Sequence, residues 1–475
     1  MLELATQQAG PFTGWLASQL QSGLPVAPRA VVNARKPRHG TRPAPIMPIP
    51  ERVAYRSIVD FLLGAEAPVA RSREDYLSFI RGPVDYVMHK AEGIRTVGLL
   101  LDDDEIKYVV KSDLSAFYEY IDHGVLGRSL IARTRNVELV EDLMSFLAEI
   151  EGRSYGIPQM FDASDRLSEL YAQLIHDQLS RRGYLVWRFN DDFRIGVSGF
   201  DVALDAIEAL SEEARSLGLI INEQKTVSPK FATYAIATFG LDSVDDEIPS
   251  DEQDEVEAAV ADYTEMFGDA DDAVTLLQRA VSGDYEWNLS DVSQDQVGQL
   301  RRAIWSVVRE RDARAVPALV PLAVFVPSLT PAICRYAEAL AEERQQEVAG
   351  VVDTIIARVS LGGWQRLWFN RLLRTSKLLL QPAPGDTTTR IRFAEACAGD
   401  GRHPATRAEA ILALAGTGTV SVREIADFLV TEPRALASWY VMAAGECVRT
   451  ERDQKVLRGI SGSDPLYSML IDALS

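Results

Sequence analysis

Cysteine is scarce in this chain of 475 residues, which has only Cys334, Cys397 and Cys447. Three widely spaced cysteines exclude a disulfide framework and a zinc site of the usual spacing, and they are typical of a reducing compartment. Runs of about 18 apolar residues are also missing, which excludes a membrane-spanning helix. The start, MLELATQQAGPF, lacks the basic and apolar regions of a signal peptide. The sequence therefore predicts a soluble cytoplasmic protein with no membrane partner.

Positive charge is in deficit as well. The chain has 49 Lys and Arg residues against 69 Asp and Glu residues, a net charge of −20, and a uniformly acidic protein repels the phosphate backbone of nucleic acids. However, residues 242–272 hold 14 acidic residues and no Lys or Arg, and setting them aside leaves a net charge of only −6. Conversely, five Lys and Arg residues and no acidic residue lie from Arg29 to Arg42. The total charge therefore does not exclude a nucleic-acid partner.

Composition divides the chain into four parts. Residues 1–50 form a basic, proline-rich segment whose closely spaced prolines exclude a helix over RKPRHGTRPAPIMPIP. Residues 51–241 alternate helical periodicity with short β-branched or aromatic runs, which indicates an α+β domain. Residues 242–272 form an acidic junction, interpreted as a solvated linker or alternatively as a nucleic-acid mimic. Residues 273–475 show short amphipathic helices, which predict an α-helical domain of the HEAT-like or bundle type.

Three aspartates in the α+β part are placed to meet at one end of a sheet. The run KYVVKSD is a short strand ending at Asp113, and YLVWRFNDDFRIGV is typical of a hairpin with Asp191 and Asp192 at its tip. If that strand lies beside the hairpin, the carboxylates converge, and such oxygen ligands suit Mg²⁺, with Mn²⁺ as an alternative. Two such ions about 4 Å apart activate a 3′-hydroxyl and stabilise departing pyrophosphate.

Each of these signals has a plainer interpretation. An Asp-Asp pair between apolar runs is more often a simple hairpin turn, and the run Asp102–Asp104 is expected to bind nothing. Because adjacent side chains on a turn rarely face one ion together, Asp192 is expected to matter least of the three. The order of the neighbouring motifs is what favours a metal site.

With those neighbours, the chain resembles the reverse transcriptases, and specifically the abortive-infection and unknown-group enzymes of bacterial antiphage defence. The resemblance covers roughly residues 30–240 and implies right-hand polymerase fingers and a palm with a ferredoxin-like antiparallel sheet, followed by an all-α, repeat-like domain. The matching segments, in the family's order, are the fingers segment RKPRHGTRPAPIMPIPERVAYRSIVDFLL, the first palm motif KSDLSAFYEYID, the template-and-nucleotide motif GIPQ, the Asp-Asp box FNDDF and the later palm motif GLIINEQKT.

The resemblance implies two sets of site residues. The catalytic set would hold the metal ions and protonate departing pyrophosphate, and it consists of Asp113, Asp191, Asp192 and Lys225. In the nucleotide-binding set, Lys36 and Arg42 would clamp the triphosphate. Tyr118 would pack beneath the sugar and favour deoxynucleotides, and Gln159 would touch the nucleotide or the template. The alternative interpretations are a core tyrosine for Tyr118 and a surface lysine for Lys225.

Two positions depart from the family's pattern. Met160 stands where glycine usually follows the glutamine, and a side chain there is expected to crowd the nascent base pair; Asn190 replaces a small residue before the Asp pair. The implied activity is an RNA-directed DNA polymerase using deoxynucleoside triphosphates, with unusual or absent templating. Its partners would be RNA or DNA, a dedicated non-coding RNA being one option, and the helical domain is a candidate surface for homo-oligomers.

Other functions remain open at this point. One is a catalytically silent scaffold of the same fold that binds RNA or protein in defence, and another is a nucleotide cyclase, which the GIPQ segment disfavours. In the helical part, Trp364 and Trp368 share a helical face that is either buried or available for base stacking. Tyr440 and Tyr467 are interpreted as packing residues, with protein priming as the alternative role of their hydroxyls.

Overall fold

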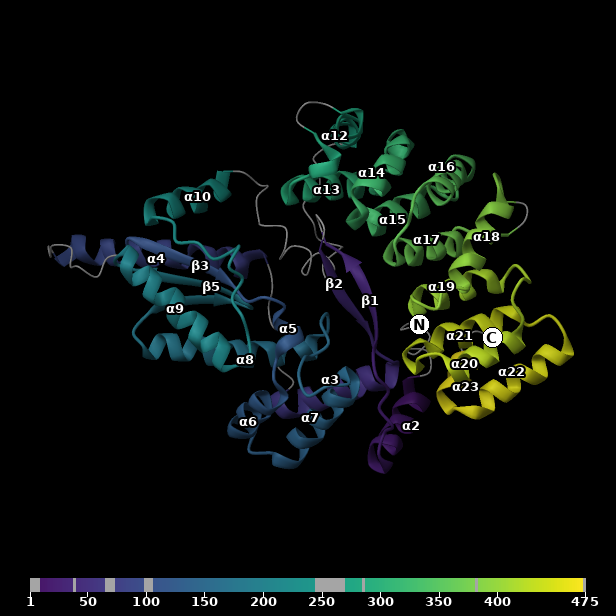
Figure 1. Ribbon diagram of the computed structural model, residues 1–475, viewed down its shortest axis with the longest axis horizontal. Coiled ribbons are helices and arrows are strands. Elements are labelled where there is room, and N and C mark those ends of the chain that lie inside the picture. The colour runs from purple at the N-terminus through teal and green to yellow at the C-terminus, as the bar shows by residue number, and fades with distance from the viewer. Residues whose placement is uncertain are drawn as a thin grey trace. The chain divides into compact units, whose positions relative to one another are not determined.

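The chain divides into two compact units in the computed structural model (Figure 1). The sheet unit comprises Arg52–Ile248, and the helical unit comprises Met1–Glu51 together with Pro249–Ser475. The run Asp102–Asp104 and most of the acidic junction lie outside the residues that the structure describes. Those described are residues 9–36, 40–64, 73–97, 106–243, 270–283, 287–380 and 383–472.

The sheet unit is built on three antiparallel strands: β3 (Tyr108–Asp113), β4 (Leu185–Phe189) and β5 (Asp192–Val197), in the order β3-β5-β4. These are the strand and the hairpin that the sequence predicts. The central strand β5 is buried along its whole length. Its register places Asp192 opposite both Asp113 of β3 and Phe189 of β4, so β4 and β5 are joined by only two residues.

Helices cover both faces of this sheet (Figure 1). On one face, α4 (Arg73–Val97) contacts β4 and β5, and α10 (Phe231–Ser243) contacts α4 and β3. On the other face lie α8 (Asp162–Arg181), which contacts β4, and α9 (Phe200–Ser216), which contacts β3 and β5. Four other helices come before α8 in the chain: α3 (Ile49–Leu63), α5 (Phe117–Tyr120), α6 (His123–Thr134) and α7 (Val137–Glu151).

After α9 the chain returns along the outer edge of β3. Helix α9 ends at the predicted glycine, because Gly218 adopts φ 79°, which glycine reaches without strain. Val227 and Lys111 then exchange backbone hydrogen bonds of 2.9 and 2.8 Å, and the Asn222 amide donates to the carbonyl of Asp113 at 2.7 Å. The return segment thereby lies against the strand end that carries the first aspartate.

Described residues from 270 onward form helices only, and none of the described helices has the length and apolar character needed to cross a bilayer. Short 3-10 helices η1 (Leu289–Asp291), η2 (Ala313–Ala318), η3 (Pro327–Leu329) and η4 (Arg434–Leu436) connect some of them. The α-helices are α12 (Ala270–Ser282), α13 (Gln294–Glu310), α14 (Leu319–Phe325), α15 (Thr330–Leu340), α16 (Gln345–Arg358), α17 (Gly363–Thr375), α18 (Thr387–Ala398), α19 (Pro404–Ala415), α20 (Val422–Thr431), α21 (Ala437–Cys447), α22 (Glu451–Ser463) and α23 (Pro465–Asp472).

These helices stack as successive helical pairs. One series of contacts runs α13 to α15, α17, α19, α21 and α23, each helix touching the next but one in the chain. A second series joins α14 to α16 and α16 to α18. Contacts between next-but-one helices are what stacked helical hairpins produce. The helical part is therefore repeat-like, as its short amphipathic helices indicate.

The N-terminal basic segment packs onto this stack. Strands β1 (Ala30–Arg35) and β2 (Thr41–Ile46) form a hairpin, and β1 contacts α17 and α19. Pro43 and Pro45 occupy alternate positions of β2, and proline fits a strand only where its missing N–H would point away from the neighbour. The proline-rich part of the segment is therefore extended, as its prolines indicate, whereas α2 (Ala9–Ser22) precedes it as a helix. Both belong to the same compact unit as the C-terminal helices.

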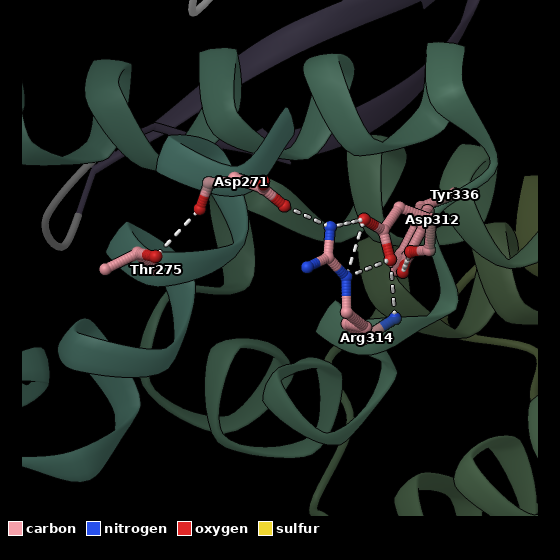
Figure 2. Close-up of polar contacts among 5 residues, drawn as sticks. All are labelled: Asp271, Thr275, Asp312, Arg314 and Tyr336. Atoms are coloured by element: carbon pink, nitrogen blue, oxygen red, sulfur yellow. Dashed lines mark hydrogen bonds and ion pairs between the residues drawn. The ribbon is translucent and has the colours of Figure 1, made fainter. Parts of the chain in front are cut away.

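An arginine ties the first described helix after the acidic junction to η2 (Figure 2). Arg314 Nη2 donates to Asp271 of α12 at 2.6 Å, and Arg314 Nε donates to both oxygens of Asp312 at 2.9 and 3.0 Å. The guanidinium holds the pKa of the Asp312 carboxyl below its usual range. The Tyr336 hydroxyl donates to the Asp312 carbonyl, and the Thr275 hydroxyl donates to that of Asp271. At least the last acids of the junction thus have a structural role.

Candidate active site

The three predicted carboxylates meet at one end of the sheet. Asp113 ends β3, Asp192 begins β5, and Asp191 lies in the loop between β4 and β5. Oxygen atoms of the three side chains all lie within 4.8 Å of one another. Asp113 and Asp192 are buried, and Asp191 is half-buried. Within the described ranges, this is the one group of three or more His, Cys, Asp or Glu side chains close enough to share a metal ion.

Strand register and a tight turn produce this convergence. Asp113 and Asp192 are directly opposite each other on antiparallel strands, which places their side chains on the same face of the sheet. Asn190 adopts φ 53°, a left-handed conformation that a two-residue hairpin loop needs and that asparagine tolerates. The turn returns Asp191 toward the pair. Asp191 and Asp192 thus both approach Asp113, and the expectation that Asp192 matters least of the three stays a prediction.

Basic side chains lie beside the cluster. Lys225 Nζ lies 3.2 Å from Asp113 Oδ2, and Arg194 Nη1 lies 3.7 Å from Asp192 Oδ1. Burial nevertheless raises the pKa of Asp192 to about 6; nearby Asp113 adds to the rise, and Arg194, Lys225 and Lys111 oppose it. Ionised carboxylates this close repel one another in a buried site. A divalent cation would add positive charge directly between the three carboxylates.

The turn after residue 221 presents two side chains to the first aspartate. The Asn222 amide group donates to Asp113 Oδ2 at 3.2 Å, in addition to the backbone hydrogen bond at the same residue. Thr226 Oγ1 donates to the Asn222 carbonyl at 2.8 Å, which closes the turn and places Lys225 beside the carboxylate. The Lys225 side chain stays 43% exposed. The sequence reasoning identified Lys225 and missed Asn222.

Arg188 is a second residue that the sequence reasoning missed. It lies on β4, its side chain is 5% exposed, and it forms a forked ion pair with Glu169 of α8. Its Nη1 also donates to the Asn190 carbonyl at 3.0 Å, and its Nη2 donates to Gln173 Oε1 at 3.0 Å. The side-chain Nδ2 of Asn190 donates in turn to Asp191 Oδ1 at 2.7 Å. An arginine inside a strand that is covered on both faces was the available signal, because a buried charge requires partners.

Tyr118 is 4% exposed and has the surroundings of a packed residue. Its hydroxyl donates to Asp165 Oδ1 at 2.7 Å and accepts from Ser168 Oγ at 3.2 Å, both on α8. Its ring lies edge-on to Phe117, with ring centres 5.6 Å apart. These contacts fit the core-tyrosine interpretation, and a place beneath the sugar stays a prediction.

The GIPQ segment connects α7 to α8 and is hydrogen-bonded to the α5 segment. Gln159 Oε1 is buried and has no hydrogen-bond partner among the residues that the structure describes. Met160 adopts φ 66°, the backbone conformation that glycine reaches freely and that costs other residues about 1 kcal/mol. The position therefore keeps a glycine-like backbone although the residue is methionine. The Met160 side chain is 58% exposed to solvent.

Lys36 and Arg42 lie together on the β1–β2 hairpin of the helical unit. Lys36 directly follows β1, is exposed, and donates its backbone N–H to the Gly40 carbonyl at 3.0 Å. Arg42 is opposite Ala34 in the two-stranded ladder. The hairpin thus places both basic residues near its turn, whereas the three carboxylates belong to the sheet unit.

The aromatic residues singled out in the helical part are packed. Trp364 and Trp368 lie edge-on with ring centres 5.6 Å apart, and Trp368 packs against the buried core of the unit. The Arg371 guanidinium lies 5.1 Å from the centre of the Trp368 ring. Tyr440 is fully buried and stacks on Phe428 at 5.6 Å. For Trp368 and Tyr440, the packing interpretation is therefore correct.

No protein-family model and no curated protein sequence matches this chain. Among solved structures, it is similar to telomerase from Candida albicans in complex with a TWJ fragment of telomeric RNA, at 13% identity over 70% of this chain and 62% of that one, with a TM-score of 0.32. Apo telomerase from Candida tropicalis is similar at 12% identity over 86% of this chain and 68% of that one, also with a TM-score of 0.32. The chain thus spans less than two thirds of the first of these structures.

Proposed function

We propose that this protein is a nucleotidyltransferase of the reverse-transcriptase type, which adds deoxynucleotides to a 3′-hydroxyl. The observation that carries the proposal is the meeting of Asp113, Asp191 and Asp192 within 4.8 Å at the end of an antiparallel sheet. These residues come from two motifs that occur in the order of the reverse transcriptases, with the GIPQ segment between them. A plain hairpin turn does not require a third carboxylate from a separate strand.

The donor set fits divalent metal ions. All three ligands are carboxylate oxygens, which Mg²⁺ and Mn²⁺ prefer, and few protein ligands leave room for water and substrate phosphates. Bound there, Mg²⁺ ions would lower the pKa of the 3′-hydroxyl and stabilise charge on the departing pyrophosphate. The protein's part is to hold the three carboxylates close together in their ionised form, against their mutual repulsion.

We propose that Lys225 donates a proton to the departing pyrophosphate. Its ammonium group lies 3.2 Å from Asp113 Oδ2 and is 43% exposed, so it is near the carboxylates and open to a ligand. A lysine in this place can give a proton to a leaving oxygen in the transition state. Gln159, whose Oε1 has no partner among the described residues, would offer an acceptor to the nucleotide or template. The Tyr118 ring would limit space at the sugar.

The triphosphate is assigned to Lys36 and Arg42. Arginine's forked donors suit phosphate oxygens, and lysine adds a point charge. Both residues lie on one hairpin, which keeps them together. The proposed nucleotide site would therefore draw its charge from the basic N-terminal segment, and the net acidity of the whole chain would not prevent it from binding an anion.

We further propose a role in bacterial antiphage defence in the cytoplasm, with RNA, DNA or a dedicated non-coding RNA as partner and the helical unit as a surface for self-association. This part rests on the motif resemblance and on the repeat-like helical unit. Met160 in place of glycine supports unusual or absent templating, because its side chain adds bulk where the family's backbone is bare.

The test is incorporation of labelled deoxynucleotides by the purified full chain with Mg²⁺, with and without added RNA. We expect incorporation that Asp191→Asn abolishes. The matched control is Asp205→Asn, which makes the same chemical change at an exposed position of α9 and should leave the rate unchanged. Absence of incorporation with every template, together with co-purified RNA, would contradict the proposal and favour the silent scaffold. Sequencing the product would show whether a template is copied.

A further inference from the structure

Two tyrosines form a stacked pair on the surface of the sheet unit. Tyr120 is 50% exposed and Tyr155 is 38% exposed, and their ring planes differ by 6° with centres 6.2 Å apart. The Arg153 guanidinium lies over the Tyr155 ring, 4.5 Å from its centre. The same guanidinium lies 3.7 Å from the Glu151 carboxylate and donates to the Glu119 carbonyl at 3.3 Å, which fixes it over the ring. The exposed parallel rings and the guanidinium together offer flat surfaces for stacking.

The backbone holds this pair in place. Tyr155 forms an antiparallel bridge with Asp122, and the amides of the two residues after it, Gly156 and Ile157, donate to carbonyls of the α5 segment at 2.8 Å each. Gly156 adopts φ 88°, and a Cβ atom there would lie 3.0 Å from the Glu119 carbonyl oxygen. Only glycine therefore permits the close approach that brings the two rings together. The pair is preformed, so a ligand would not have to order it.

Both tyrosines are close in sequence to motifs of the candidate site. Tyr120 follows Asp113 by seven residues, and Tyr155 directly precedes the GIPQ motif. Between Asp113 and Tyr120, the Ser115 amide donates to the Ile220 carbonyl at 2.8 Å, two residues before Asn222. The tyrosine pair and the carboxylate cluster are thus fixed to one hydrogen-bonded frame within one compact unit.

We infer that Tyr120, Tyr155 and Arg153 form a base-stacking platform for single-stranded nucleic acid, an inference that rests on the proposed polymerase function. Every nucleobase has a flat π-face that stacks on an exposed tyrosine, whatever the sequence. Arginine adds a planar guanidinium that can itself stack on a base. The occupant is a base of the strand being extended or copied, because the platform shares its frame with the residues proposed to carry out the chemistry.

The test measures binding of fluorescent oligonucleotides to the full chain carrying Asp191→Asn, so that no extension occurs. Oligothymidylate of about 16 nucleotides, the upper end of common single-strand site sizes, is compared with an abasic strand of the same length. Tyr155→Ala should weaken binding of the thymidylate about ten-fold, and Tyr155→Phe should retain it because the ring remains. Phe61→Ala, at an aromatic residue that is 74% exposed on α3, is the matched control and should have no effect.

The abasic strand separates stacking from a general loss of binding. The protein with Tyr155 intact should bind the abasic strand more weakly than the thymidylate, and Tyr155→Ala should weaken abasic binding no further. Equal binding of the thymidylate by Tyr155→Ala, or an equal loss on both strands, would overturn the platform. An active wild-type polymerase whose binding ignores Tyr155 would overturn the platform alone. An inactive wild-type protein with base-dependent binding through Tyr155 would overturn the polymerase proposal alone. An oligouridylate of the same length distinguishes RNA from DNA.

Discussion

At the scale of single residues, the carboxylate cluster is a place where function opposes stability. Asp192 is buried beside Asp113, and both effects favour its neutral form, so its pKa rises to about 6 from an ordinary value near 3.8. Around pH 7 the folded protein must therefore hold an ionised carboxylate that the unfolded chain holds more easily. Carboxyl groups with a raised pKa of this kind are common at functional sites.

Asp192→Asn should therefore stabilise the metal-free protein at neutral pH. The raised pKa means that the wild type loses stability as pH rises from about 4 to about 6, by on the order of 1–3 kcal/mol in the free energy of unfolding. Asparagine of the same shape removes that loss. Urea unfolding in EDTA should show the variant more stable at pH 7. The difference should shrink as the pH falls and vanish near about pH 3, below both pKa values, where Asp192 is protonated in both states.

The converse measurement uses the metal. Added Mg²⁺ should stabilise the wild type at pH 7 and leave Asp192→Asn nearly unaffected, because binding to the folded state alone shifts unfolding by mass action. A variant that is less stable than the wild type at pH 7 in EDTA would contradict the argument. Asp205→Asn, at an exposed position, should change neither measurement.

At the scale of elements, α8 supports the candidate site through hydrogen bonds to two residues near the carboxylates. Through Asp165 and Ser168 it holds the hydroxyl of Tyr118, and through Glu169 and Gln173 it holds Arg188. One rigid helix therefore fixes both the segment that follows the first carboxylate and the turn that carries the second. Rigid elements position such groups more exactly than loops do.

Arg188→Met should loosen the turn that carries Asp191. The change removes a buried guanidinium that holds the Asn190 carbonyl and the Glu169 carboxylate, so we expect a loss of about 2 kcal/mol in the free energy of unfolding. The concentration of Mg²⁺ needed for half-maximal incorporation should also rise several-fold, with a smaller change in rate at saturating Mg²⁺. Unfolding curves and Mg²⁺ titrations of activity measure the two effects.

Arg182→Met provides the contrast for this prediction. Arg182 is 42% exposed and pairs with Glu212 and Glu213 on the surface. Exposed ion pairs contribute between zero and about 1 kcal/mol, so this variant should be close to the wild type in stability and in its Mg²⁺ requirement. If Arg182→Met and Arg188→Met behaved alike, the turn-holding role of Arg188 would be refuted.

At the scale of the whole molecule, charge is separated along the chain. The acidic excess is concentrated at residues 242–272, whereas the basic N-terminal residues form a hairpin on the helical stack. The proposal gives Lys36 and Arg42, in the helical unit, a part in binding the nucleotide whose chemistry belongs to the sheet unit. The basic N-terminal hairpin would then be needed for nucleotide binding.

Replacing Lys36 and Arg42 together by alanine should raise KM for deoxynucleotides at least ten-fold and lower kcat much less, because phosphate contacts made before the chemical step contribute mainly to binding. Arg42→Lys should give a KM between those of the wild type and the double variant, since lysine keeps the charge and loses the forked geometry. Steady-state kinetics measure both constants. Arg29→Ala, which removes one basic residue before β1, is the control; an unchanged KM in the double variant would remove these residues from the site.

Much of the local structure was predictable because its causes are local. Strand β3, the β4–β5 hairpin and the end of α9 follow from short-range patterns and from Gly218. The capping box at Ser421 and Glu424 forms as its spacing indicates, with the Glu424 amide donating to Ser421 Oγ at 3.3 Å. Neighbouring residues interact in the same way whatever the rest of the chain does.

Other features depend on contacts that have no local signal. The partners of Arg188 on α8, the tyrosine pair and the Asn222 contact each join residues that lie 15 or more positions apart. Ala30, Val32 and Ile46 of the hairpin pack against a core formed mainly by residues after 400. Hydrophobic burial is non-directional, so a small apolar strand face does not reveal which distant surface will cover it.

The sequence by itself indicated the three candidate carboxylates, because an aspartate at a strand end and an Asp-Asp pair between two strand-like runs are visible in the order of the chain. Only the tertiary structure decided that all three face one point and that the basic hairpin joins the helices. Strand register and long-range packing set both outcomes: a shift of one residue in register reverses which face a side chain takes, and that register is selected by the burial of the whole sheet between its helices.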